Sequence, residues 1–330
     1  MLKILYAGSP EDSALTLKSL LEKSKDLSNG FEIVGVLTNP PTAKGRHSEL
    51  VPTPVAQVAA QWNNSTGSTI KIFEPEHLDF PCRQSVESTG AELLLCFAYG
   101  HIFGPKFMAL FKFGGMNMHP SLLPKYRGCT PVNAAILAED DVTGISIQTI
   151  SPKCDEGDLF FQKKINLNKT ETAQSLLTYC AQNCVEPIVE SLKFISQNQK
   201  LPPLTKQTGD SSYCNMIKKE DGKINWANDV HKIDAQNRAY YPWPGTFTTF
   251  NGISLKIIQG KIFEGELKDS VTAENAKPGT VLEFNKQNGI LIKCGSGIYC
   301  ATELQLQAKK AMDYKSFMNG TRNFVGALLE

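Results

Sequence analysis

Short apolar runs alternate with amphipathic stretches along 1–199. The apolar runs predict buried strands, and leucines spaced three and four residues apart in 13–24 predict a helix. We expect a second helix over 51–62. The predicted strands cover 2–8, 31–39, 68–75, 91–100, 114–120 and 144–150. Strands that alternate with helices in this way predict an α/β fold with a doubly wound, mostly parallel sheet.

The pattern changes after a long amphipathic stretch over 171–197, which predicts one helix. The polar segment that follows contains a Pro-Pro pair and predicts a linker. Beyond it, short alternating runs in 246–265 and 277–306 predict strands joined by Asn-Gly and Gly-Ser-Gly turns, as in a small β-barrel or sandwich. The predicted parts are a first domain over 1–199, a linker over 200–212 and a smaller domain over 213–330.

Composition narrows the class of protein. The 330 residues are 41% hydrophobic, which is enough for a substantial core, and the net charge of +1 gives no global nucleic-acid signature. No apolar run approaches the roughly 20 residues of a membrane span, and the N-terminus has no leader pattern. The nine cysteines are scattered without a CxxC pair. We therefore expect a cytoplasmic protein with reduced thiols and no structural zinc.

Asn117, His119 and Asp155 combine polar chemistry with positions beside predicted strands. Asn117 and His119 are two residues apart in an extended run, so their side chains point to the same side. Asp155 follows the strand over 144–150, and we expect it to face His119 from the end of a neighbouring parallel strand. A carboxylate beside histidine raises the imidazole pKa and favours the cation. An imidazolium and an asparagine amide form a donor pair for an oxyanion, which predicts acyl or formyl transfer to a substrate amine.

Each of these residues alone also has an ordinary structural interpretation. A single histidine near a strand end is more often a structural hydrogen-bonding group, and asparagine before a turn is commonly a cap. The acidic run over 155–158 fits a simple surface turn. The prediction of a site therefore rests on the joint placement of these side chains on loops at one edge of the sheet.

Other segments give weaker signals. The turn Gly8-Ser9-Pro10 lacks the GxGxxG pattern of dinucleotide-binding proteins. Ser121 has no GxSxG context, and nothing marks Cys129 as a reactive thiolate. The remaining histidines have no metal-ligand spacing, so we expect no metal. The basic loop around Arg46 fits a solvated surface loop and an anion-binding loop equally well.

The segment SLLPKYRG (121–128), preceded by Asn117 and His119, resembles the signature of the folate-dependent formyltransferases. The first half has further segments similar to that family, namely YAGSP (6–10), AKGR (43–46), FAYGHIFGP (97–105) and Asp155-x-Gly157. The second half resembles the C-terminal domain of methionyl-tRNA formyltransferases in DGKINW (221–226), RAYYPWPG (238–245), KPGTVLE (277–283) and LQLQAKKAM (304–312). The resemblance covers nearly the whole chain, and it implies a Rossmann-like formyltransferase domain followed by an OB-like β-barrel that binds tRNA.

The resemblance also implies roles for individual residues. Asn117 and His119 would stabilise the oxyanion as an amine attacks the formyl carbon of 10-formyltetrahydrofolate, while Asp155 would orient and charge His119. Arg46 would reach the acceptor end of the tRNA or its aminoacyl group. The residues implied to bind the folate are Ser121, Leu122, Leu123, Pro124, Phe97, Tyr99, Gly100 and Ile102. The implied protein is a monomeric, metal-free cytoplasmic transferase that formylates methionyl-initiator tRNA for translation initiation.

Other functions stay open from the sequence. The same formyl chemistry serves formyltetrahydrofolate hydrolases and formyltransferases that act on amino sugars. Glycinamide ribonucleotide enzymes are disfavoured because they lack the second domain. A non-catalytic RNA-binding protein of the same fold is a further class, against which the presence of Asn117, His119 and Asp155 argues. Cys129 is one departure from the family, whose members commonly have a small residue such as alanine there.

Overall fold

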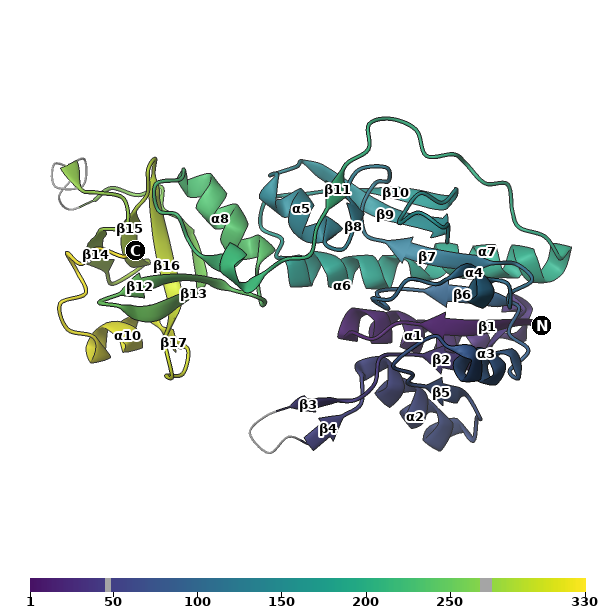
Figure 1. Ribbon diagram of the computed structural model, residues 1–330. Coiled ribbons are helices and arrows are strands. Elements are labelled where there is room, and N and C mark those ends of the chain that lie inside the picture. The colour runs from purple at the N-terminus through teal and green to yellow at the C-terminus, as the bar shows by residue number, and fades with distance from the viewer. Residues whose placement is uncertain (45–48, 268–274) are drawn as a thin grey trace. The chain divides into compact units, whose positions relative to one another are not determined.

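The computed structural model describes residues 1–44, 49–267 and 275–330 (Figure 1). These residues form two compact units. The first unit comprises Met1–Pro131, Val142–Asn166 and Leu177–Cys214. The second unit comprises Val132–Asp141, Leu167–Leu176 and Asn215–Glu330.

A mixed seven-stranded sheet forms the centre of the first unit in the described residues, in the order β10-β9-β7-β6-β1-β2-β5 (Figure 1). The five strands β7, β6, β1, β2 and β5 are parallel to one another. Strand β9 is antiparallel to β7, and β10 is antiparallel to β9. The strands are β1 (Leu2–Ala7), β2 (Phe31–Leu37), β5 (Lys71–Phe73), β6 (Leu93–Cys96), β7 (Gly115–His119), β9 (Val142–Thr149) and β10 (Leu159–Asn166). The predicted doubly wound, mostly parallel sheet is confirmed.

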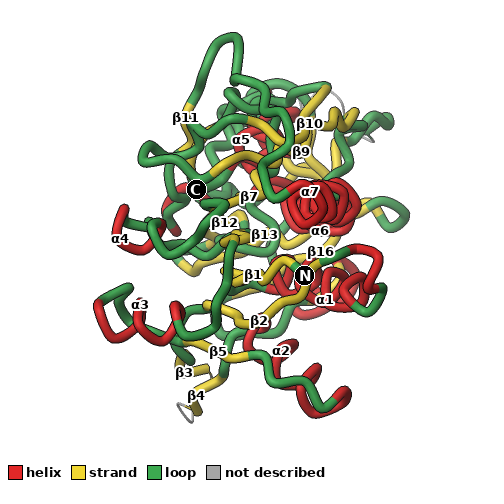
Figure 2. The backbone as a smooth tube through the Cα atoms, turned by 90° about the vertical axis from the view of Figure 1, so that its right-hand side faces the viewer, coloured by secondary structure: helices red, strands yellow, loops and turns green. Residues whose placement is uncertain are grey.

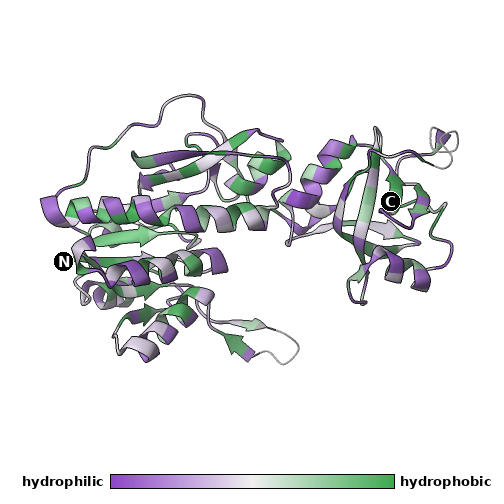
Figure 3. Cartoon of the chain, turned by 180° about the vertical axis from the view of Figure 1, so that it is seen from behind, coloured by the Kyte–Doolittle hydropathy of each residue, from purple (hydrophilic) through white to green (hydrophobic). Residues whose placement is uncertain are grey.

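Helices cover both faces of this sheet, as Figure 2 shows with α3 and α4 on one side and α1, α2 and α7 on the other. The central strands are buried on both faces, so β6 is a continuous apolar run rather than an alternating one. Figure 3 shows the apolar residues on these strands, while the helices carry both polar and apolar faces. The helices are α1 (Glu11–Ser24), α2 (Pro54–Thr66), α3 (Phe80–Glu87), α4 (Pro105–Met108), α6 (Ala173–Asn183) and α7 (Val185–Asn198).

The single helix predicted over 171–197 is wrong, because the structure has α6 and α7 in its place. Pro187 is the third residue of α7. Proline has no backbone N–H, and its ring clashes with the carbonyl four residues earlier, here that of Asn183. The helix is therefore interrupted at Cys184, between Asn183 and Val185.

Short elements complete the first unit. The segment predicted as a linker, 200–212, belongs to this unit because backbone hydrogen bonds attach it there. Leu159 and Thr205 exchange two such bonds, and the Arg127 N–H donates to the Ser212 carbonyl. The short elements are β3 (Thr42–Lys44), β4 (Glu49–Val51), β8 (Arg127–Gly128), β11 (Tyr213–Cys214) and a 3-10 turn at Leu27–Asn29, while α5 (Pro131–Leu137) and α6 each include residues of both units.

The second unit contains a separate antiparallel sheet in the order β12-β13-β16-β15-β14, with β17 beside β16. The predicted Asn-Gly turn between the first two strands is present, and Asn251 and Gly252 both have the positive φ that such hairpins require. The elements are α8 (Val230–Ala239), β12 (Thr246–Phe250), β13 (Ile253–Ile262), β14 (Val281–Asn285), β15 (Gly289–Lys293), β16 (Ile298–Leu306), β17 (Met312–Asp313), α10 (Tyr314–Gly320) and a 3-10 turn at Lys219–Gly222.

The C-terminal residues bridge the two edges that the strand ladders leave open. The Val281 N–H of β14 donates to the Ala327 carbonyl at 2.9 Å. Thr249 of β12 exchanges two backbone hydrogen bonds with Glu330, at 2.7 and 3.1 Å. In place of the predicted barrel, the described residues form an antiparallel sheet. Its outer strands, β12 and β14, both hydrogen-bond to the irregular C-terminal segment.

Candidate active site

Strand β7 brings two of the predicted site residues onto one face of the sheet. Asn117 lies opposite Cys96 of β6 and opposite Gln148 of β9, and His119 lies opposite Ser146. Paired residues on neighbouring strands point to the same face, and residues two apart on a strand share it. The side chains of Asn117, Gln148, His119 and Ser146 therefore form one polar group on this face of the sheet.

Asp155 reaches this group, although not from the end of a parallel strand as predicted. Strand β9 runs antiparallel to β7, so its carboxyl end lies beside the start of β7 rather than beside His119. The loop after β9 folds back, and the Thr149 N–H closes it by donating to the Asp158 carbonyl at 2.8 Å. Asp155 Oδ1 consequently lies 3.5 Å from His119 Nδ1.

The Asp155 carboxylate is held by three donors. Gly128 N–H donates to Oδ2 at 2.8 Å, and Gln148 Nε2 donates to Oδ1 at 2.7 Å. The Cys154 thiol donates to Oδ2 at 3.3 Å. Burial and the nearby carboxylate raise the pKa of Cys154 to about 12, so this thiol stays protonated and available as a donor at neutral pH. The carboxylate is therefore fixed in direction before any substrate binds.

Two glycines of the sequence motifs allow these contacts. A Cβ on Gly157 would lie 1.8 Å from the Thr149 carbonyl oxygen, and one on Gly128 would lie 2.3 Å from the Cys214 carbonyl oxygen. Gly128 also has a φ of +105°, which disfavours any other residue. The Arg-Gly end of SLLPKYRG and the Asp-x-Gly motif thus meet at the Asp155 carboxylate.

The prediction that Asp155 keeps His119 cationic is wrong in its net effect. His119 is 4% exposed, and burial lowers the pKa of its imidazole below the ordinary value. Asp155 and the hydrogen bond to the Tyr126 carbonyl each raise that pKa, as expected, but burial is the larger influence. His119 is therefore predominantly neutral at neutral pH.

The partners of the His119 ring define which nitrogen carries the proton. Nε2 lies 2.8 Å from the Tyr126 carbonyl oxygen, which only accepts, so Nε2 must donate. In the neutral ring this leaves a lone pair on Nδ1, which faces Asp155. A proton taken up by Nδ1 would lie between the imidazole and the carboxylate, so Asp155 stabilises the ring when it becomes charged.

Asn117 is half-buried, and its side-chain amide makes no hydrogen bond with any residue in the described part of the chain. An amide N–H without a protein partner is available to a substrate oxygen. Asn117, His119 and Asp155 are thus close neighbours, with the first free to donate and the other two linked. The structure brings together all three residues that the sequence predicts.

The segment 121–124 is rigidly attached beside this group. Ser146 Oγ donates to the Ser121 carbonyl at 2.6 Å and accepts from the Leu123 N–H at 3.1 Å. Gln162 Nε2 donates to the Leu123 carbonyl at 2.8 Å. Ser121, Leu123 and Pro124 are buried and Leu122 is half-buried. These contacts fix the shape of the segment, and its predicted role in binding folate stays a prediction.

The other segment predicted to bind folate, 97–102, follows β6. Phe97 and Tyr99 are buried in the core, whereas Gly100 is exposed and Ile102 is 88% exposed. Asn39, which follows β2, hydrogen-bonds to this loop at two points. Its Nδ2 donates to the Tyr99 carbonyl at 3.4 Å, and its Oδ1 lies 2.9 Å from His101 Nε2. The loop therefore presents its backbone and Ile102 to solvent, while its aromatic side chains anchor it.

Two further sequence-based expectations have different outcomes. Arg46, predicted to contact the substrate, lies outside the described residues. Cys129 is exposed, and its backbone N–H donates to the Cys214 carbonyl.

All nine cysteines are free thiols. Across the residues described, no three His, Cys, Asp or Glu side chains gather as metal ligands would, and no helix is long and apolar enough to cross a membrane.

Comparison with known proteins identifies the family. The formyl transferase family model matches residues 2–192, and the model of the formyl transferase C-terminal domain matches 216–322. A methionyl-tRNA formyltransferase from Treponema denticola is 40% identical over 326 residues, which cover 98% of each chain. The chain belongs to the methionyl-tRNA formyltransferase family.

Solved structures agree with the fold of this formyltransferase. HypX from Aquifex aeolicus, in complex with tetrahydrofolic acid, matches with a TM-score of 0.65 and 14% identity, covering 98% of this chain and 48% of that one. Methionyl-tRNA formyltransferase from Clostridium thermocellum matches with a TM-score of 0.55 and 16% identity, covering 81% of this chain and 96% of that one. At these identities the likeness establishes the arrangement of elements.

Sequence reasoning missed three residues that support the site of this formyltransferase. Gln148 binds the Asp155 carboxylate, and Gln207 donates to the Asp155 carbonyl at 2.8 Å. Arg127 donates to Gln207 and forms an ion pair with Glu156 at 3.2 Å. Gln148 follows Ile147 in an apolar strand, and a polar side chain within a buried strand is the signal that could have identified it. Gln207 gave no such signal because it lies in a polar segment.

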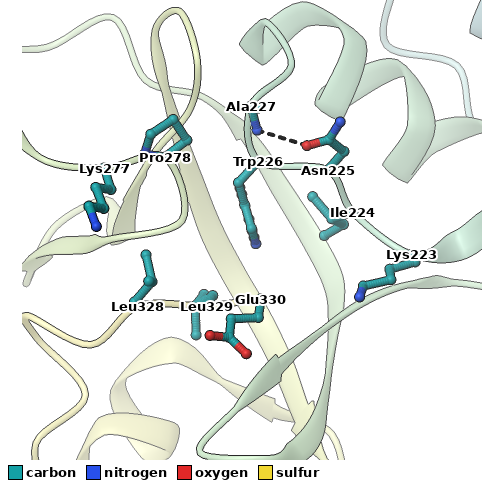
Figure 4. A pocket seen from close by; sticks show the side chains of 10 residues that line it. All are labelled: Lys223, Ile224, Asn225, Trp226, Ala227, Lys277, Pro278, Leu328, Leu329 and Glu330. Atoms are coloured by element: carbon teal, nitrogen blue, oxygen red, sulfur yellow. Dashed lines mark hydrogen bonds between the residues drawn. The ribbon is translucent and has the colours of Figure 1, made fainter.

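A surface pocket of about 620 Å³ lies in the second unit of this formyltransferase, away from these residues in the sequence (Figure 4). The Trp226 indole, which is 4% exposed, donates to Thr248 Oγ1 at 3.0 Å. The lining residues are Lys223, Ile224, Asn225, Trp226, Ala227, Lys277, Pro278, Leu328, Leu329 and Glu330. The described residues of the lining include no histidine, so the pocket lacks the pairing of an imidazole with a carboxylate that His119 and Asp155 form in the first unit.

Proposed function

We propose that this protein transfers the formyl group of 10-formyltetrahydrofolate to the amino group of methionyl-initiator tRNA. The observation that carries the proposal is the group formed by Asn117, His119 and Asp155 in a chain that aligns over almost its full length with a methionyl-tRNA formyltransferase. An uncatalysed attack of an amine on a formyl group has no positioned donor for the oxyanion and no positioned acceptor for the proton. The free amide, the histidine and the fixed carboxylate supply these groups.

Asn117 supplies the oxyanion donor in this proposal. When the methionyl nitrogen bonds to the formyl carbon, the formyl oxygen gains negative charge in the tetrahedral intermediate. The unpartnered Asn117 N–H stabilises that charge, and His119 Nε2–H adds a second donor if it exchanges the Tyr126 carbonyl for the oxyanion. Because Asn117 lies within β7 and its amide has no partner among the described residues to give up, little reorganisation of this donor accompanies the attack.

In this proposal, His119 and Asp155 transfer the proton of the attacking amine. A neutral His119 accepts the proton that the attacking amine loses, directly or through water, and Asp155 stabilises the resulting imidazolium. The same proton then passes to the folate nitrogen as its bond to the formyl carbon breaks. A buried histidine with a lowered pKa suits this task, since it is unprotonated at neutral pH and has a carboxylate at 3.5 Å for its charged form.

The segments 121–124 and 97–102 are proposed to bind the folate. Both are anchored by internal hydrogen bonds, so their exposed atoms are positioned without the ligand. The substrate end of the tRNA is proposed to be bound with the help of Arg46. We further propose that the protein acts as a cytoplasmic monomer without a metal.

A formyl-transfer assay tests the function. Wild-type protein, His119→Ala and the matched control His77→Ala are each mixed with 10-formyltetrahydrofolate and methionyl-initiator tRNA, and a parallel reaction omits the tRNA. His77 is exposed in the loop after β5, so its substitution is expected to leave the rate unchanged. Loss of an oxyanion donor typically lowers the rate about 100- to 1000-fold, which is the loss expected for His119→Ala and for Asn117→Ala.

The same assay distinguishes the alternatives. Folate turnover without tRNA would indicate a hydrolase, and formylation of an amino sugar in preference to charged tRNA would indicate a different acceptor. Tight tRNA binding without turnover would indicate an RNA-binding protein that has lost catalysis. A full rate in His119→Ala and Asn117→Ala would refute the assignment of the site while leaving the reaction intact.

A further inference from the structure

Gln207 lies in the extended segment 200–212 and makes an unusually complete set of hydrogen bonds to the Asp155 loop. Its Nε2 donates to the carbonyls of Asp155 and Gly157, both at 2.8 Å, and lies 3.3 Å from Gln148 Oε1. Its Oε1 accepts from Arg127 Nε at 3.2 Å and from Nη2 at 2.8 Å. One side-chain amide thus joins four residues of three different segments.

The carbonyl that Gln207 binds belongs to a strained residue. Asp155 has a φ of 54°, in the left-handed region that residues other than glycine adopt at a cost of about 1 kcal/mol or more. The side chain leaves the backbone at Cα, so the backbone conformation of Asp155 determines where its carboxylate lies. The hydrogen bonds from Gln207 Nε2 to the carbonyls of Asp155 and Gly157 oppose relaxation of the Asp155 backbone to the ordinary helical or extended regions.

Neighbouring contacts attach the same segment on both sides of Gln207. Thr205 exchanges two backbone hydrogen bonds with Leu159 at 2.7 and 3.0 Å, and Tyr213 Oη donates to Glu156 Oε1 at 2.7 Å. Arg127 Nη1 is 3.2 Å from the same Glu156 oxygen. The segment therefore follows the Asp155 loop for several residues, and Gln207 occupies the middle of this contact.

We propose that Gln207 is a positioning residue for formyl transfer, which holds the Asp155 loop in the conformation that directs its carboxylate to His119. The inference rests on the proposed function, because it assigns Gln207 to the reaction through Asp155. It also assigns the segment that we predicted as a linker to the support of the active site. Gln207 acts only through Asp155, since its own amide is fully engaged by protein atoms.

Two substitutions separate the contacts of Gln207. Gln207→Glu preserves the shape and the acceptor for Arg127, but it places an oxygen against the carbonyls of Asp155 and Gly157 in place of the donor. Gln207→Leu removes both kinds of contact. Gln197→Glu is the matched control, because Gln197 is an exposed residue of α7 and receives the same change of charge.

The decisive measurement is a double-mutant cycle on kcat, with Gln207→Glu placed in the wild-type and in the Asp155→Ala background. In the wild-type background we expect kcat to fall about 10- to 100-fold, as misplacement of a reacting group by about 1 Å can cause, with both KM values within about 2-fold. In the Asp155→Ala background we expect no further fall. Circular dichroism and the melting temperature verify that each variant is folded.

A general structural role gives a different result. If Gln207→Glu and Gln207→Leu lower kcat by the same factor in both backgrounds, or leave wild-type kcat unchanged, the proposal is overturned. Failure of the proposed function is seen separately, in wild-type protein that does not formylate methionyl-tRNA. If the wild type uses another amine, the cycle is measured with that amine and decides the role of Gln207 in the same way.

Discussion

Gly157 places the Asp155 carboxylate by permitting a backbone approach that any side chain would block. The Asp-x-Gly spacing was visible in the sequence, but its reason lies in the 1.8 Å that would separate an added Cβ from the Thr149 carbonyl oxygen. The sequence predicted Asn117, His119 and Asp155 because each lies beside an apolar run. It could not predict the net pKa of His119, because burial of a side chain depends on packing from elements distant in sequence.

Substitution of Gly157 is predicted to damage both stability and catalysis. Gly157→Ala forces the Asp155 loop away from β9, and overpacking of this kind costs about 1–3 kcal/mol. We expect a melting temperature lower by several degrees, together with a lower kcat. Gly320→Ala is the control, since an added Cβ there meets nothing within 4 Å. Equal melting temperatures for the two variants would show that the loop tolerates the displacement.

His119 is predicted to make stability depend on pH. Its folded-state pKa lies below the ordinary value of about 6.5 because burial disfavours the imidazolium, so the unfolded state binds more protons in that range. This contribution is fully present above pH 6.5 and is lost as the pH falls below it. The free energy of unfolding of wild-type protein should therefore decrease more steeply between about pH 7.5 and 5.5 than that of His119→Gln.

Chemical denaturation at several pH values measures this slope. The control is His77→Gln, an exposed histidine whose substitution should leave the wild-type slope unchanged. Parallel slopes for wild type and His119→Gln would mean that His119 takes up its proton equally in both states, contrary to the expected effect of burial.

At the scale of elements, periodicity predicted the strands of the first unit well because most of them are buried on both faces. It did not predict that β9 runs antiparallel to β7, since an apolar run such as GISIQTI carries no information on direction. The helix predicted over 171–197 overlooked Pro187, whose effect on the preceding turn was readable from the sequence. The attachment of 200–212 depends on the backbone hydrogen bonds between Thr205 and Leu159 and on the side-chain contacts of Gln207 with the Asp155 loop, which no local pattern indicates.

The C-terminal segment of the second unit is predicted to contribute substantially to its stability. Leu329 is 2% exposed and belongs to the core, whereas its neighbour Leu328 is 44% exposed at the pocket in Figure 4. Leu329→Ala should lower the free energy of unfolding by about 2–4 kcal/mol, and Leu328→Ala by less than about 0.5 kcal/mol. Denaturant titration gives both values. Similar losses for the two variants would mean that the segment does not pack in solution as described.

At the scale of the whole molecule, the net charge of +1 neither favours nor disfavours the binding of tRNA. Binding to phosphates depends on local distribution of charge, and the exposed pair Lys309-Lys310 follows β16 in the second unit. The first unit has an exposed pair of its own, Lys163-Lys164 on β10. These pairs allow a local contact to be separated from an effect of total charge.

We predict that the double substitution Lys309→Glu, Lys310→Glu raises KM for methionyl-tRNA about 10-fold or more, since each phosphate contact adds to affinity. KM for 10-formyltetrahydrofolate should stay unchanged, because the proposed folate segments belong to the first unit. Lys163→Glu, Lys164→Glu changes the net charge by the same amount and serves as the matched control. Steady-state kinetics at two salt concentrations measures both, and the effect of Lys309-Lys310 should shrink at the higher salt. An equal rise in KM for the two double variants would mean that overall charge, rather than a tRNA-binding surface in the second unit, governs the encounter.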